Sequence, residues 1–281
     1  MKKKLLALFF VLLTAAVGVL QYKYDSHRGY FSEREVFVTL PPGKTLRILS
    51  FGFHDLAADM LFIWSIQFYS TYYLTNSSRY IEQVFNTITD LSPRYKEPYI
   101  VGSWIMALEV GDIGMAMRLL RKGSANMPDE FIFDYECGFY AYKNLKDYAL
   151  AEKFFSRAAG KPGAPPQIKR KQAHMAYMKD DLHYAYQLWM DIYNKAKDSL
   201  ELNVARNHLG QIKFEMDKKY LEQQITRFKQ IYKRFPLELA ELKRAGLVKE
   251  IPRDFYGKPY IYYPGKGTVT AEKVLRWKKS F

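Results

Sequence analysis

Apolar positions follow three different patterns along the chain. An uncharged apolar run extends from Leu5 to Leu20, directly after three lysines. A second apolar stretch, residues 45–74, has apolar side chains on most faces of a helix, which predicts one long buried helix in a segment 45–77 that packs on the helices after it. Between residues 78 and 234, short amphipathic helices alternate with Pro, Gly and Asp breaks. These patterns predict a mainly helical fold.

The N-terminal run has the form of a targeting or membrane segment. Lys2 to Lys4 form a basic region before the apolar residues 5–20. A spanning helix needs about 17–25 apolar residues, so this run is at the short end. Two interpretations stay open: a cleaved signal peptide, or an uncleaved signal anchor in residues 1–22, which we favour because no clean A-x-A cleavage motif is present. Both place the remaining chain outside the cytoplasm, since lysines favour the cytoplasmic side; a buried helix of a soluble protein is the third alternative.

The breaks in the helical region recur at a near-constant interval. Pro93, Pro128 and Pro162 are 35 and 34 residues apart. Small and large residues recur around them, in successive units Ala116, Leu120 and Gly123, then Gly138, Ala151, Phe155 and Ala158, then Ala173, Ala185, Trp189 and Ile192. Residues 78–234 thus resemble the tetratricopeptide repeat family, with 200–215 and 217–234 as a terminal helix pair. The resemblance implies stacked helical hairpins that form a superhelix; an irregular bundle with chance spacing is the alternative.

The C-terminal residues 235–281 form a different segment, as residues 23–44 do before the helices. A short helix that ends at Gly246 precedes two β-prone runs joined by the turn 264–267. Pro252, Asp254, Gly257, Pro259 and Tyr260 follow in the order D-x-x-G-x-P-Y with an upstream proline. This segment resembles the C-terminal part of type II secretion pseudopilins, which implies a small helix-plus-hairpin module. The segment 23–44, with Pro41-Pro42-Gly43, is predicted to be a linker.

Charge is concentrated at the C-terminal end of the chain. The net charge is +14, and residues 217–281 carry 16 bases and 7 acids, a net +9. Export from the cytoplasm argues against a nucleic-acid partner. The alternative function is binding of a polyanion (anionic lipid, polysaccharide or nucleic acid) through this basic tail. The tail residues that alternate bases with apolar side chains are predicted to contact an anionic surface. They are Lys273, Arg276, Trp277, Lys278 and Lys279.

The sequence contains no recognisable catalytic or metal-binding motif. One cysteine excludes a disulfide framework and a multi-cysteine metal site. The five histidines form no pair with a known ligand spacing, and no serine lies in a G-x-S-x-G motif. His54 and Asp59 are the only candidates for catalysis, and a structural role for Asp59 is the simpler interpretation. The sequence predicts no enzyme, no metal, no cofactor and no small-molecule substrate.

Surface recognition is the function that remains. The first helix of each predicted hairpin would line a concave groove. The groove residues predicted from the repeat register are Tyr135, Phe139, Tyr142, Arg170, His174, Tyr177, Asn207 and Gln211. A one-residue register error turns a helical side chain by about 100°, so packing between helices is the alternative for each. The sequence predicts a single-pass protein of the bacterial cytoplasmic membrane, an extracytoplasmic scaffold that binds an extended peptide or helix of a protein partner. A secretion or pilus-type assembly is the setting that the pseudopilin resemblance implies.

Overall fold

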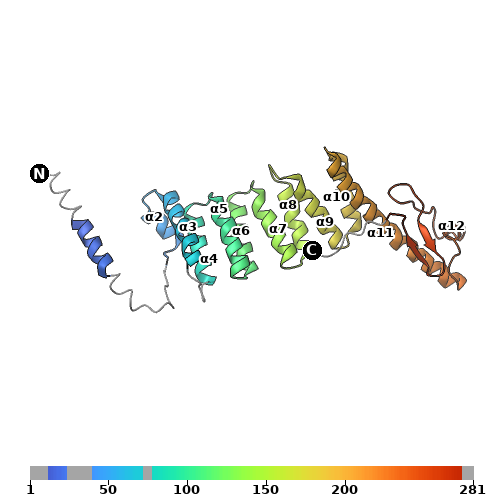
Figure 1. Ribbon diagram of the computed structural model, residues 1–281, viewed down its shortest axis with the longest axis horizontal. Coiled ribbons are helices and arrows are strands. Elements are labelled where there is room, and N and C mark those ends of the chain that lie inside the picture. The colour runs from blue at the N-terminus through green and yellow to red at the C-terminus, as the bar shows by residue number, and fades with distance from the viewer. Residues whose placement is uncertain (1–11, 24–39, 72–77, 274–281) are drawn as a thin grey trace. The chain divides into compact units, whose positions relative to one another are not determined.

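The computed structural model describes residues 12–23, 40–71 and 78–273 (Figure 1). The chain divides into two compact units, Met1–Pro42 and Gly43–Phe281. In the first unit residues 12–23 are helical. Within the described ranges, no helix is both long and apolar enough to cross a membrane. The predicted membrane segment 5–20 begins outside those ranges, and most of the predicted linker 23–44 lies outside them too.

The larger unit is mainly helical, as its sequence pattern predicts. Its helices are arranged in chain order, and most of them pack against the next one (Figure 1). They are α2 (Gly43–Leu49), α3 (His54–Thr71), α4 (Ser78–Leu91), α5 (Lys96–Trp104), α6 (Ile113–Asn126), α7 (Phe131–Lys143), α8 (Tyr148–Ala159), α9 (Pro166–Met178), α10 (Leu182–Lys195), α11 (Ser199–Tyr232) and α12 (Ala240–Arg244). A π-helix, η2 (Ile105–Glu109), continues α5, and strands β1 (Ile261–Tyr263) and β2 (Thr268–Thr270) form a hairpin.

The apolar stretch after the linker is two helices and not the single buried helix that its pattern predicts. The chain turns between α2 and α3, where Phe51 has a φ of 47° and Gly52 a φ of 94°. Such positive φ angles are incompatible with a continuous right-handed helix. Both helices pack on α4, yet much of their apolar surface is exposed. Asp59 is exposed as well and hydrogen-bonds to the side chain of Tyr95.

Helices α5 to α11 form a repeat-like series of hairpins. The first helices of the hairpins, α5, α7, α9 and α11, begin at residues 96, 131, 166 and 199, hence at intervals of 35, 35 and 33 residues. The second helices, α6, α8 and α10, begin at residues 113, 148 and 182, at intervals of 35 and 34 residues. Nearly all large helix contacts join sequence neighbours. The near-constant interval in the sequence therefore corresponds to a repeated structural unit.

The turn inside each hairpin has the same local design. An aspartate caps the second helix, and its carboxylate accepts a hydrogen bond from the backbone N–H three residues later, at 2.8, 2.9 and 3.2 Å for Asp112, Asp147 and Asp181. The preceding residues have positive φ angles of 77°, 56° and 65° at Gly111, Lys146 and Asp180. Each cap satisfies a backbone donor that the first helical turn would otherwise leave unpaired.

Small residues allow the helices of a hairpin to approach closely. A Cβ atom on Gly138 of α7 would lie 2.8 Å from the ring of Phe155 on α8, which is fully buried. A Cβ atom on Gly123 would likewise lie 3.0 Å from the rings of Phe133 and Tyr99. The aromatic rings thus occupy the space that a side chain would need, which explains why glycine and large residues recur together in the sequence.

A buried carboxylate links three helices in the middle of the series. Asp134 on α7 is 1% exposed, and it pairs with Arg157 Nη2 and Lys161 Nζ, both at 2.7 Å. Ser124 on α6 donates a further hydrogen bond to the Asp134 carboxylate, at 3.4 Å. Two cations and a hydroxyl compensate the cost of burying this charge.

The last predicted helix pair is one continuous helix of 34 residues, α11. The sequence places a break at Asp217, but that side chain pairs with Lys213 Nζ at 2.7 Å and accepts a hydrogen bond from the Tyr260 hydroxyl at 2.6 Å. The aspartate therefore serves a tertiary contact inside the helix and does not cap a new one. The first half of α11 packs against α10, and its second half packs against the C-terminal segment.

The C-terminal segment has the short helix and the hairpin that the sequence predicts. Strands β1 and β2 are antiparallel, with Tyr262 opposite Val269. Asp254 Oδ1 accepts hydrogen bonds from the backbone N–H groups of Tyr256 at 2.9 Å and Lys258 at 2.7 Å. This turn positions Tyr260 against Phe214 of α11, at 6.0 Å between ring centroids. The module packs on the helix that closes the repeat-like series.

Candidate functional site: a cationic pocket on the first helices of the hairpins

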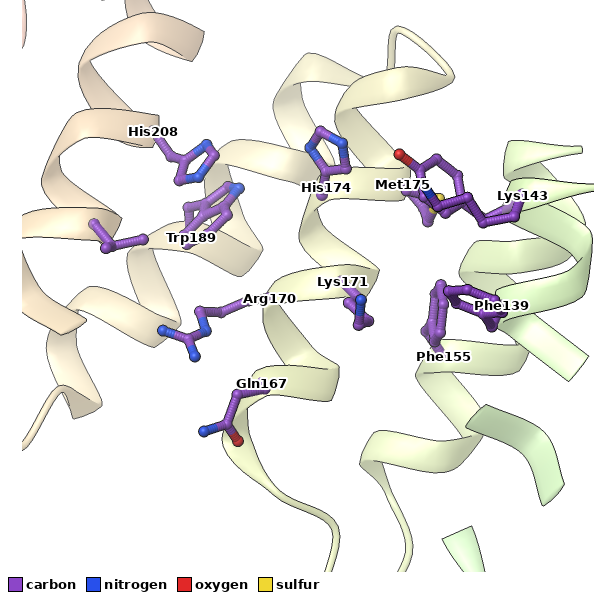
Figure 2. A pocket seen from close by; sticks show the side chains of 12 residues that line it. Phe139, Lys143, Phe155, Gln167, Arg170, Lys171, His174, Met175, Trp189 and His208 are labelled. Carbon is purple, nitrogen blue, oxygen red and sulfur yellow. The ribbon is translucent and has the colours of Figure 1, made fainter. Parts of the chain in front are cut away.

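A pocket of about 450 Å³ lies over helices α7, α9 and α11 (Figure 2). These are the first helices of successive hairpins, the elements on which the sequence predicts a groove. The residues that line it are Phe139, Tyr142, Lys143, Phe155, Gln167, Arg170, Lys171, His174, Met175, Trp189, Val204 and His208. A volume of this size accommodates a large side chain or a few residues of an extended peptide.

Four of the eight predicted groove residues line this pocket. They are Phe139, Tyr142, Arg170 and His174. The Tyr142 and His174 rings meet edge-to-face across α7 and α9, with centroids 6.4 Å apart. The structure thus brings together two rings from successive repeats of the chain.

The other four predicted residues lie beside the pocket. Tyr135 packs on Phe155, with ring centroids 5.9 Å apart. Gln211 donates a hydrogen bond from Nε2 to the Tyr177 hydroxyl at 2.8 Å, and that hydroxyl donates to Glu215 Oε1 at 2.6 Å. These two residues therefore connect α9 to α11. Asn207 is half-buried on α11.

Positive charge converges on the pocket. Lys143, Arg170 and Lys171 supply cationic groups from α7 and α9, and none of the described residues that line the pocket is acidic. Figure 2 shows Arg170 and Lys171 on successive positions of one helix, with Lys143 on the neighbouring helix. Lys143 lies over the Tyr142 ring at 5.4 Å and Lys171 over the Tyr135 ring at 5.9 Å, both to the ring centroid. Cation–π contacts of this kind hold cationic groups beside the aromatic rings at the pocket.

Burial lowers the proton affinities of the basic residues in the pocket, and neighbouring cations add to the effect. Burial lowers the pKa of Lys171, and Lys143 lowers it further. Burial also lowers the pKa of His174, with Lys171 adding to the effect. The pKa of His208 falls to about 3, chiefly through burial and then through His174 and Arg170. Each shift favours the neutral form of the group, and an anion bound beside it would favour the charged form again.

One end of the pocket carries a stacked ring pair. Trp189 and His208 lie parallel, with centroids 3.8 Å apart and an interplanar angle of 13° (Figure 2). Trp189 is 2% exposed, and its buried Nε1 has no hydrogen-bond partner among the described residues. A buried N–H donor of this kind costs free energy unless an acceptor reaches it.

The sequence reasoning missed several pocket residues for an identifiable reason. Val204 and His208 face the pocket from α11, while the prediction chose Asn207 and Gln211. The two pairs differ by three residues. The prediction placed a helix break at Asp217, so it did not have the continuous helix α11 from which to set which residues face the groove. Lys143 and Lys171 each follow a predicted groove residue directly, about 100° further around the helix, so a prediction confined to one narrow helix face missed them.

The residues predicted to contact an anionic surface lie at the end of the described chain. Lys273 is exposed, while Arg276, Trp277, Lys278 and Lys279 lie outside the described residues. Their predicted role stays a prediction.

The sequence was compared with protein-family models and with curated proteins. No family model matches it, and no curated protein is significantly similar to it.

Proposed function

We propose that this chain is a protein-interaction scaffold that binds an acidic segment of a partner through the pocket on α7, α9 and α11. The observation that supports the proposal is the convergence of Lys143, Arg170 and Lys171 on a pocket whose described lining contains no acidic residue. Aromatic rings beside these cations supply contact area, and cations supply charge-assisted hydrogen bonds to carboxylates.

The occupant that suits this pocket is an extended peptide that carries Glu or Asp next to an aromatic or aliphatic side chain. Its carboxylate would accept from Arg170 and Lys171. The apolar side chain would lie against Phe139. This is recognition without chemical change, so the proposed function is that of a scaffold and not of an enzyme.

The proposal extends to family and location. We infer a tetratricopeptide-type series from the repeat interval, the recurrent Asp caps and the Gly138–Phe155 packing. Residues 5–20 would anchor the chain in a bacterial cytoplasmic membrane, with the pocket on the extracytoplasmic side. The pseudopilin-like order of residues 252–260 supports a secretion or pilus-type assembly as the source of the partner.

A defined peptide pair tests the proposal. A fluorescent peptide of alternating Glu and Tyr is titrated with the full chain in detergent micelles, and fluorescence anisotropy gives its Kd. The matched peptide has Gln in place of Glu. The Glu peptide should bind more tightly, and the double variant Arg170→Gln/Lys171→Gln should weaken it by about 10-fold or more, because each charged hydrogen bond contributes about 1.5–3 kcal/mol.

A charge-matched control separates the pocket from the net charge of the chain. Lys153 on α8 and Lys197 before α11 are exposed and do not line the pocket, so Lys153→Gln/Lys197→Gln, which also removes two charges, should leave the Kd unchanged. The affinity should also rise as the pH falls from about 7.5 to about 5.5, because a bound anion raises the pKa of His174 and binding then takes up a proton. Equal binding of the Glu and Gln peptides, or equal losses in the pocket variant and the control, would contradict the proposal.

A further inference from the structure

Helix α3 is apolar on two opposite sides. One side packs on α4 and includes Ala58 and Phe62, which are 0% and 8% exposed. The opposite side carries Leu56, Met60 and Ile63, spaced four and three residues apart and therefore on one face. These three side chains are 56%, 66% and 57% exposed. An exposed row of large apolar side chains on a helix indicates a surface that another apolar phase covers.

The turn before α3 extends this apolar surface. Phe51 and Phe53 are 86% and 70% exposed, and Ile48 and Leu49 at the end of α2 are 77% and 56% exposed. The turn is ordered, because the Phe53 N–H donates to the Ser50 carbonyl at 2.8 Å. A rigid turn that displays two phenylalanine rings outward is not explained by packing within this unit.

The charges next to this surface distinguish among the possible occupants. Lys44 and Arg47 of α2 are exposed and adjacent in sequence to the apolar residues. The acids near this surface interact within the unit: Asp90 of α4, which lies against Gly43, pairs with Lys122 at 2.5 Å. Asp55 lies in the first turn of α3, where the helix dipole favours a negative charge, and Asp59 hydrogen-bonds to Tyr95. Exposed cations beside exposed aromatic and aliphatic side chains are typical of a helix that lies in the interface of an anionic bilayer.

We propose that α2, the turn at 50–53 and the exposed face of α3 form a lipid-contacting surface that lies in the headgroup region of an anionic membrane. This inference rests on the proposed membrane anchoring, because residues 5–20 end 22 residues before α2 and the same bilayer is then within the chain's reach. The apolar side chains enter the acyl boundary, and Lys44 and Arg47 contact lipid phosphates.

Site-specific fluorescence on the full chain tests this surface. Phe51→Cys and, separately, Met60→Cys are labelled with an environment-sensitive dye; buried Cys137 stays unlabelled in the folded protein. Leu200→Cys is the control, because Leu200 is 73% exposed and lies on α11. The proteins are reconstituted into vesicles of phosphatidylglycerol and phosphatidylethanolamine and isolated by flotation. A doxyl-labelled lipid and aqueous iodide serve as quenchers.

The expected result is quenching by the doxyl lipid, with severalfold weaker iodide quenching, at positions 51 and 60 but not at 200. If iodide quenches the dyes at 51 and 60 as strongly as the dye at 200, in protein that floats with the vesicles, the proposed lipid contact is refuted while the anchor stands. Dyes shielded from both quenchers would overturn it in favour of a protein segment or second copy that covers the face. Protein that does not float would overturn both this surface and the anchor.

Discussion

The close approach of α7 and α8 gives a quantitative prediction for Gly138→Ala. The new Cβ atom would lie 2.8 and 2.9 Å from two ring carbons of Phe155, well inside an ordinary carbon–carbon contact of about 3.5–4.0 Å. Forcing an extra methyl group into such a site costs about 1–3 kcal/mol. Replacing a helical glycine by alanine gains about 0.8–1.0 kcal/mol. The net effect on the free energy of unfolding is therefore a loss of up to about 2 kcal/mol.

Gly114→Ala is the matched control for this prediction. Gly114 is exposed on α6, and the nearest atom to its new Cβ would be Asp112 Oδ1 at 3.2 Å, the oxygen that accepts the capping hydrogen bond from the Met115 N–H. A shift of a few tenths of an ångström relieves this contact, which is less than the Phe155 ring would need. This variant should keep the propensity gain, so the two alanine variants should differ by about 1–3 kcal/mol. Thermal unfolding followed by circular dichroism measures the difference, with about 2–4 °C per kcal/mol for a domain of this size class. If Gly138→Ala melts at the same temperature as Gly114→Ala or higher, the packing argument for this hairpin is refuted.

Three further predictions concern buried polar groups. Asp134→Asn removes a buried charge and leaves Arg157 and Lys161 without their carboxylate, so urea denaturation should show a loss of about 3 kcal/mol, the low end for a broken buried pair because the Arg157 side chain is half exposed. An unchanged midpoint would contradict the buried ion pair. Because the pKa of folded His208 is lowered to about 3, the unfolded chain binds the proton first as the pH falls below about 6.5, and stability is lost from there toward about pH 3. His208→Asn should flatten that acid loss in urea titrations, and an unaltered slope would count against the shift. Burial raises the pKa of the Cys137 thiol to about 12, so iodoacetamide should label it only after denaturation, and rapid labelling of the folded chain would contradict its burial.

Local sequence signals predicted the elements whose ends depend on nearby residues. The hairpin turns before α6 and α10 follow from Gly111-Asp112 and Asp180-Asp181, because an aspartate cap acts on a backbone group only three residues away. The same residue type misled the prediction at Asp217. Its partner Tyr260 lies 43 residues downstream, and a tertiary contact of that separation leaves no local trace in the helix.

The pocket shows the same division between local and tertiary information. The helical period places Tyr142 and His174 on inward faces of α7 and α9, and the sequence predicts four of the twelve residues that line the pocket. Val204 and His208 depend on how α11 turns against α10, which the stacking of His208 on Trp189 fixes. The exposed face at Phe51 was missed because an apolar run predicts burial, and the sequence does not say whether protein or another phase covers it.

The continuous helix α11 also has a mechanical consequence. Val204 and His208 lie on its first half at the pocket, while Leu221 and Ile225 lie on its second half in the core of the C-terminal module. A helix of 34 residues is about 50 Å long and behaves as a stiff rod over that length. If an occupant of the pocket tilted this rod by about 10°, its far end would move by about 9 Å. The helix would then act as a lever that converts a small displacement at one site into a large swing of the module at its other end.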